Sequence, residues 1–198
     1  MAIPSRDEAA RILRSLEPPS WHLQHSAAVA DVAAFLAQKI EEQGHAISTS
    51  LVEAAALLHD VDKALPKSEP LKGLGHADAG AHWLSDNGYG ELSGAVAAHP
   101  VTRLADNDHY ATWARAATVE ERVVAYADKR AKSDLVSMDE RFDNWVRKHG
   151  ATEVMRVARE RAEILEASVC AAAGIRPEDV ERLRWAEAAL ADNALQPG

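Results

Sequence analysis

Alanine occupies 40 of the 198 positions in this chain, about one residue in five. Because alanine is the best helix former and a poor strand former, this composition nearly excludes an all-β fold. No segment of useful length alternates apolar and polar residues as a half-buried strand does. Hydrophobic residues make up 47% of the chain, which is enough for a buried core and excludes a disordered chain. The sequence therefore predicts an all-α fold.

Capping residues, glycines and prolines divide the chain into a series of predicted helices. The expected N-terminal caps are Ser5, Ser20, Ser50 and Thr118. The predicted helices cover about residues 5–17, 20–44, 50–60, 76–86, 91–98, 118–133, 138–148, 152–173 and 177–192. Residues 62–75 hold two prolines and two glycines and are predicted to be the clearest loop. Residues 100–117 are predicted to be loop with one helical turn.

The charge balance restricts the partners of the chain. Lys and Arg number 22 and Asp and Glu number 31, which gives a net charge of −9. This argues against binding to long nucleic acid or to an anionic membrane surface, because both need a basic face. Apolar runs are far shorter than the ~20 residues that a membrane helix needs.

The single cysteine and the N-terminal residues bear on location. Cys170 is the only cysteine in the chain, which excludes an intrachain disulfide and a cysteine zinc cluster. The first residues show no apolar stretch behind a basic start, so no signal peptide is predicted. We therefore expect a cytoplasmic protein.

Seven His and Asp residues lie where chemistry is plausible. They are His22, His25, His59, Asp60, His76, His99 and Asp128. Taken singly, a helical His is more often a surface or satisfied core residue than a ligand, and an Asp at a helix end is usually a cap. Asp128 differs, because Val124 and Tyr126 flank it in a stretch that should be buried. A buried carboxylate is costly unless it pairs or binds a metal.

The ordered set of His25, His59-Asp60 and Asp128 resembles the HD superfamily of metal-dependent phosphohydrolases. The local sequences HSAAVA, ALLHDVDK and ADK match that family's signatures. His76, in HADAGA, and His99 resemble the branch that carries extra ligands. The resemblance covers about residues 20–135. The chain length predicts a single domain over 1–198. Within it the resemblance implies an HD-like core at 20–135, and the predicted helices at 136–198 would be accessory.

The resemblance also implies a ligand set. His25, His59, Asp60 and Asp128 would hold one metal, and Asp60 would bridge to a second metal held by His76 and His99. His and Asp suit divalent transition metals, with Fe or Mn first and Co, Ni, Zn or Mg as alternatives. A metal-activated water bridging two such ions can attack a phosphate.

Further site residues follow from the same resemblance. Asp60 and Lys63 are the expected catalytic pair, and Lys63, Arg130 and His22 are the expected substrate contacts. Each of these also fits an ordinary surface charge or core residue. The remaining histidines are expected at the surface: His45, His82, His109 and His149.

The expected substrate is a nucleotide, a dinucleoside polyphosphate or a related phosphate ester. The short chain resembles bacterial dinucleoside-polyphosphate hydrolases. The net charge does not exclude such a small anion, because two metal dications would dominate the local field. A di-iron oxygenase on the same helical fold and a nucleotide-binding regulatory module that retains its metal are alternatives. A homodimer is also compatible with the apolar stripe of the C-terminal helices.

Overall fold

The computed structural model describes residues 3–66 and 70–181. Across these two stretches the regular elements are all helical, and one isolated β-bridge joins Ala131 and Leu135. The predicted all-α fold is thus confirmed. The α-helices are α1 (Arg6–Ser15), α2 (Ser20–Glu42), α3 (Thr49–Leu58), α4 (Asp78–Asp86), α5 (Ser93–Ala98), α6 (Val101–Ala105), α7 (Asn107–Ala116), α8 (Val119–Lys129), α9 (Met138–His149), α10 (Glu153–Ala173) and α11 (Pro177–Glu181). Short 3-10 helices are η1 (Val61–Ala64), η2 (Pro70–Gly73) and η3 (Gly90–Leu92).

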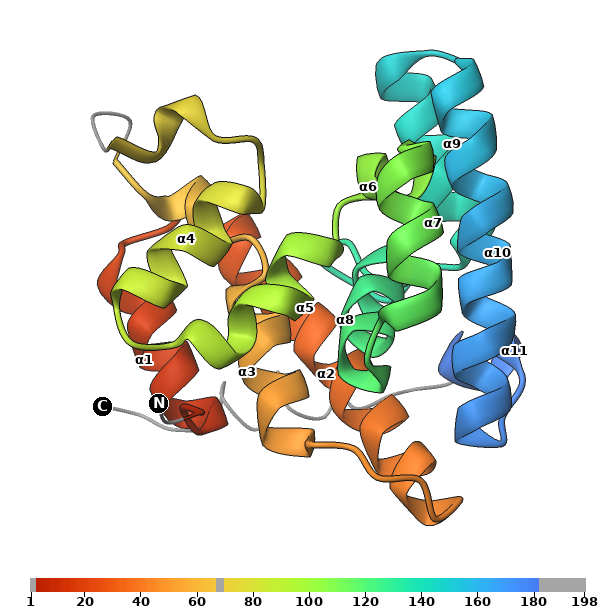
Figure 1. Cartoon of the computed structure of the whole chain (residues 1–198), viewed down its shortest axis with the longest axis horizontal. Helices are drawn as coiled ribbons and strands as arrows, with labels where there is room; N and C mark the ends of the chain where they lie inside the picture. The colour runs from red at the N-terminus through yellow and green to blue at the C-terminus, as the bar shows by residue number, and fades with distance from the viewer. Residues whose placement is uncertain (1–2, 67–69, 182–198) are drawn as a thin grey trace.

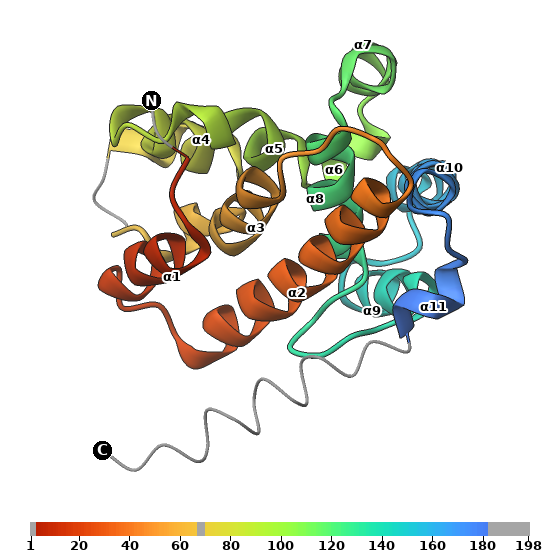
Figure 2. The same ribbon diagram turned by 90° about the horizontal axis from the view of Figure 1, so that it is seen from below.

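Helices α2, α3 and α8 pack against one another at the centre of the molecule. Helices α1, α4 and α5 lie on one side of them, and α9 and α10 lie on the other (Figures 1 and 2). The long α10 packs on α2, α6 and α8, so the C-terminal helices cover the central group rather than standing apart.

Small side chains let the central helices approach closely. The contact faces of α2 and α3 are rich in alanines that are at most 4% exposed: Ala28, Ala30, Ala33, Ala37, Ala54, Ala55 and Ala56. The distance between packed helices depends on the side chains at their contact, and alanine brings the backbones near the lower limit. The alanine excess therefore serves the packing as well as helix propensity.

Local capping signals predict some helix starts and miss others. Ser5 and Glu8 form the predicted reciprocal capping box of α1, and the Thr118 hydroxyl accepts from Glu121 N at the start of α8. Helix α2 begins at Ser20 itself, after Pro19, without a side-chain cap. The expected caps at Ser20 and Ser50 are therefore wrong.

Ser48, two residues before the expected cap of α3, occupies that position. Its hydroxyl accepts from Leu51 N, and its own N–H donates to Glu120 Oε1 of α8 at 3.0 Å. That contact comes from a distant part of the chain. Local sequence patterns therefore cannot predict it.

Residues 100–117 contain two helices, α6 and α7, where loop with one helical turn is predicted. Asp106 caps α7 by accepting from His109 N at 3.0 Å. No residue of α7 is fully buried, and its apolar face consists of partly buried side chains such as Tyr110 and Trp113. Helix α11 begins at Pro177 as predicted, and the expected continuation over 182–192 lies outside the described residues.

A buried polar network joins α8 to α10. The fully buried Arg130 guanidinium donates to Glu166 Oε1 at 3.0 Å and to Tyr126 Oη at 2.6 Å. Tyr126 Oη donates in turn to Glu166 Oε1 at 2.7 Å. Burial raises the pKa of Tyr126, so its phenol stays protonated and can donate. The core is one continuous cluster that includes α8 and α10, and we infer that the accessory helices fold with the rest as a single domain.

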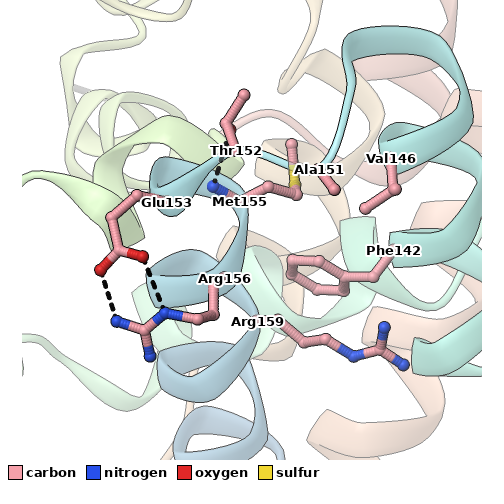
Figure 3. A pocket seen from close by; sticks show the side chains of 8 residues that line it. All are labelled: Phe142, Val146, Ala151, Thr152, Glu153, Met155, Arg156 and Arg159. Carbon is pink, nitrogen blue, oxygen red and sulfur yellow. Dashed lines mark hydrogen bonds and ion pairs between the residues drawn. The ribbon is translucent and has the colours of Figure 1, made fainter.

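A shallow apolar hollow of about 370 Å³ lies between α9 and α10, near the turn that joins them. Figure 3 shows Phe142 and Met155 lining it, with Arg156 paired to Glu153 at its edge. It contains none of the predicted site residues.

None of the helices in the described part of the chain is long and apolar enough to cross a membrane.

We expect Glu166→Ala to lower the free energy of unfolding by about 2–4 kcal/mol, because it removes a carboxylate that the buried Arg130 charge contacts. Urea denaturation measures the change. The control is Glu163→Gln on the same helix, an exposed residue 3.9 Å from Arg159, which we expect to change stability by less than about 0.5 kcal/mol. Equal effects of the two substitutions would contradict the network's role.

Candidate metal centre

Six of the predicted site residues come together at the ends of several helices. His25 lies within α2, and His59 and Asp60 follow directly after α3. The others are His76 in the turn before α4, His99 directly after α5, and Asp128 in the last turn of α8. Helix ends can aim adjacent side chains at one point, because each chain segment changes direction there.

One group of donor atoms consists of His25, His59, Asp128 and one oxygen of Asp60, and is called here the His25 group. His25 Nε2 lies 3.1 Å from His59 Nε2 and 3.4 Å from Asp128 Oδ1. Asp60 Oδ2 lies 3.5 Å from His59 Nε2 and 3.7 Å from His25 Nε2. Bonds of ~2.0–2.2 Å to a common ion give similar spacings between neighbouring ligands.

The other oxygen of Asp60 faces a second set of donors, called here the His76 group. His76 Nε2 lies 3.2 Å from Asp60 Oδ1, and His99 Nε2 lies 3.4 Å from the same oxygen. The Asp60 carboxylate thus presents one oxygen to each group. This is the arrangement that a ligand shared between two ions requires.

The four imidazoles are oriented in the same way. Each uses Nδ1 to donate to a fixed acceptor. The pairs are His25 with Lys132 O (2.9 Å), His59 with Ala56 O (2.7 Å), His99 with Val96 O (2.6 Å) and His76 with Asp62 Oδ2 (2.8 Å). A carbonyl oxygen can only accept, so Nδ1 of these rings carries the proton. Metal-binding histidines are held in the same manner, with the second nitrogen left for the ion.

These tautomers make the His25 group repulsive without a cation. Burial lowers the pKa of His59 to about 3, so its ring is neutral at pH 7 and its Nε2 carries a lone pair. That lone pair faces His25 Nε2 at 3.1 Å and two carboxylates. A divalent cation between them would convert this repulsion into four favourable contacts. The donor set therefore fits a metal ion, and His/Asp clusters here meet the spacing that one needs.

The carboxylates of both groups remain charged although they are buried. Burial raises the pKa of Asp60, but the surrounding imidazoles, among which His76 is charged, outweigh it and hold that pKa well below its usual range. Burial likewise opposes the charged form of Asp128. Lys129, His25 and Arg141 outweigh it and keep the pKa of Asp128 well below its usual range.

His76 is the most exposed member of the cluster and the one that must lose a proton. Burial favours its neutral form, but hydrogen bonds to Asp60 and Asp62 raise the pKa of His76 to about 9. A cation beside Asp60 Oδ1 would therefore displace a proton from His76 Nε2.

Two lysines contact the carboxylates. Lys63 Nζ lies 2.6 Å from Asp60 Oδ2, which brings this predicted residue to the site. Lys129 is fully buried, and its Nζ donates to the His99 carbonyl and to Asp128 Oδ2 at 3.3 Å. Lys129 thus connects the backbone of the His76 group to a carboxylate of the His25 group.

His22 and Arg130, two of the predicted substrate contacts, do not reach a surface that a substrate could touch. The His22 ring is fully buried, and neither of its nitrogens has a hydrogen-bond partner within the described residues. It lies near enough to Asp60 and Lys63 to feel their charges. Arg130 is turned the other way, into the network with Glu166, and this corrects the expectation that it contacts substrate.

A cavity of about 400 Å³ opens beside the His25 group. Its lining residues are Trp21, His25, Asp60, Lys63, Lys132, Ser133, Arg141, Trp145 and Lys148. Four of these carry positive side chains, and Asp60 is the sole carboxylate among them. In a chain with a net charge of −9, this cavity is a local exception that favours an anionic ligand.

Lys129, Asp62, Arg141 and Trp145 were not among the predicted site residues. A buried lysine at Lys129 follows from the apolar stretch around Asp128, and Asp62 stands two residues after Asp60, so both have a local signal. Arg141 and Trp145 have none, because the α9 sequence MDERFDNWVRKH reads as a charged surface helix. Their place at the site comes from the packing of α9.

We expect Lys129→Met to weaken Mn²⁺ binding about 10–100-fold, because it frees the Asp128 carboxylate and the His99 backbone that Lys129 holds. Titration of metal-free protein with Mn²⁺ measures the affinity. Lys39→Met, a half-buried residue near the end of α2 that pairs with Glu42 away from the cluster, is the control and should leave the affinity unchanged. Wild-type affinity in Lys129→Met would show that the ligands need no such support.

A model of the HD domain family matches residues 23–133, which is more than half of the chain. Searches of curated proteins and of solved structures each found no match. All six members of the cluster lie within the matched residues. HD domains are generally metal-dependent phosphohydrolases, and the buried His/Asp cluster is compatible with a divalent metal. The chain belongs to the HD domain family.

Proposed function

We propose that the protein hydrolyses a phosphate ester or anhydride bond of a small substrate, with two divalent transition metals held by the six clustered residues. Iron and manganese suit this mixed His and Asp set best. The observation that carries the proposal is the geometry of Asp60. Its two buried oxygens face separate sets of imidazole nitrogens, and one of these sets borders a cationic cavity.

The residues of the chain have distinct roles in this proposal. His25, His59, Asp60 and Asp128 would hold one ion, and His76, His99 and Asp60 the other. Ions bound there would lower the pKa of a coordinated water and offset charge on the phosphoryl oxygens. The hydrogen bonds at Nδ1 keep each ring in the orientation that this requires.

Lys63 is proposed to stabilise the phosphate and orient the attacking water. Its side chain is 41% exposed and lines the cavity, while its Nζ lies 2.6 Å from Asp60 Oδ2. A lysine at this position can donate to a phosphoryl oxygen and remain beside the shared carboxylate. The cost of desolvating it is modest, because it stays partly in water.

The cavity favours a nucleotide as the substrate class. Its lysines and arginine suit phosphates, and the exposed Trp21 offers a face on which a base can stack. Its volume of about 400 Å³ falls within the ~300–1,000 Å³ typical of small-molecule pockets. Dinucleoside polyphosphates are the members of this class that we propose to test first.

The first experiment compares wild-type protein with Asp60→Asn on a panel of phosphate esters and nucleotides, each with Mn, Fe, Co, Ni, Mg and Zn. We expect about two metals per wild-type chain, and a loss of metal together with more than about a 100-fold loss of phosphate release in the variant. Mn²⁺ should also raise the melting temperature of the wild type, because the ion binds only the folded state.

The exposed Asp86 provides the matched control, since Asp86→Asn removes a carboxylate of α4 that pairs only with His82 in the described part of the chain. Phosphate release in anaerobic buffer separates hydrolysis from an oxygenase reaction, which needs O₂. Full activity of metal-free protein, or of Asp60→Asn, would overturn the proposed function.

We expect Lys63→Ala to lower turnover about 100-fold while metal content stays at the wild-type level, because one donor to the phosphoryl oxygens is lost. Lys63→Arg should restore part of the activity. Elemental analysis and phosphate release together test this. Unchanged turnover in Lys63→Ala would return this residue to an ordinary surface charge.

A further inference from the structure

One wall of the cavity is built by α9, which lies outside the residues that match the HD family. Arg141, Trp145 and Lys148 come from this helix and face the same cavity as His25 and Asp60. The cavity therefore joins a catalytic side, which the family supplies, to a second side that belongs to this chain's accessory helices.

The Arg141 guanidinium is held in place by the Trp145 ring. Its Cζ lies 4.5 Å from the centroid of the Trp145 ring, so the guanidinium stacks on the indole. The Trp145 ring is itself fixed edge-on against the buried Phe142, with centroids 5.0 Å apart. Stacking of this kind preorganises the planar fork of an arginine for an anion.

Arg141 also has hydrogen-bonding capacity to spare. Its Nη2 lies 3.3 Å from Asp128 Oδ1, and its Nε is buried without a partner among the described residues. Asp128 does not depend on Arg141 alone, because Lys129 lies 3.3 Å from its other oxygen. Asp128 Oδ1 is the oxygen that faces His25, so a cation in the His25 group would compete with Arg141 for it.

The charge on this wall fits a second phosphate. Lys132 and Lys148 lie beside Arg141 in the cavity lining, and Glu140 pairs with Lys132 at 3.2 Å without lining the cavity. Arginine binds phosphate through two parallel N–H donors, which a lysine cannot provide. The cavity has room for more than the one phosphate that the metal centre would hold.

We propose that Arg141, held by Trp145, binds a second phosphate of the substrate and makes the protein select linked phosphates over phosphomonoesters. The inference rests on the proposed function, because it assumes that the first phosphate lies at the His25 group. Trp145 acts through Arg141 and is a positioning residue.

The test is calorimetric binding to Mn²⁺-loaded protein of two non-hydrolysable probes that differ by one phosphorus group. These are the α,β-methylene analogue of ADP and the phosphonate analogue of AMP. Wild-type protein should bind the diphosphate analogue at least about tenfold more tightly, as expected for a charge-assisted bidentate contact. In Arg141→Met this preference should fall to about threefold or less, with the metal content and the affinity for the AMP analogue nearly unchanged.

Arg141→Lys keeps the charge without the fork and should show an intermediate preference. Arg147→Met is the matched control, because Arg147 is an exposed arginine of the same helix that does not line the cavity. Its preference should equal that of the wild type. Persistence of the tenfold preference in Arg141→Met would overturn the inference. So would loss of metal from Arg141→Met and Arg141→Lys, since Arg141 would then act through Asp128.

Phosphate release measured in parallel separates the two proposals. Hydrolysis by the wild type without a preference for the diphosphate analogue would overturn the role of Arg141 and leave the proposed function standing. An Arg141-dependent preference in a protein that hydrolyses no phosphate ester would do the reverse. If neither probe binds, the role of Arg141 is overturned, and phosphate release alone decides the proposed function.

Discussion

The Asp60 carboxylate is buried and ionised, and its two oxygens face different sets of imidazoles. A buried charge of this kind is unfavourable unless every lone pair has a partner. The ends of α3 and α5 and the start of α4 must therefore meet around it. The packing of the central helices is the means by which the chain brings them there, and the alanine faces of α2 and α3 make that packing close.

Backbone carbonyls hold two of the imidazoles in fixed orientations. His59 and His99 each donate from Nδ1 to the carbonyl three residues earlier, at the end of their own helix. At the end of α5 the Val96 carbonyl also accepts from the His99 backbone N–H at 3.4 Å, so the ring uses the second lone pair of a last-turn carbonyl while it turns Nε2 inward. Hydrogen bonds to the last turns of α3 and α5 thus orient these two ligands, and no separate element is required.

The sequence was a good guide where the determinant is local. The capping box of Ser5 and Glu8 follows from a short local pattern. The six clustered His and Asp residues were expected from the resemblance to the HD superfamily, which their local sequences carry. The sequence failed where a distant contact decides. Ser48 rather than Ser50 caps α3, and Glu120 of α8 accepts from the Ser48 N–H. Helix α7 contributes only partly buried side chains to the core, such as Tyr110 and Trp113, so no buried apolar run marks it in the sequence.

The two arginines near the end of the core show the same limit and lead to a conclusion about the accessory helices. Arg130, expected at the substrate, is drawn into the protein by Glu166 of α10. Arg141, which no sequence motif singles out, contacts Asp128 and stacks on Trp145. The Arg130–Glu166 contact holds the accessory helices on α8. The stacking of Arg141 on Trp145 places the Arg141 guanidinium of those helices in the cavity. Because both depend on how α9 and α10 sit on α8, stability of that layer and shape of the cavity are linked. The part of the chain beyond the family match is thus a component of the site.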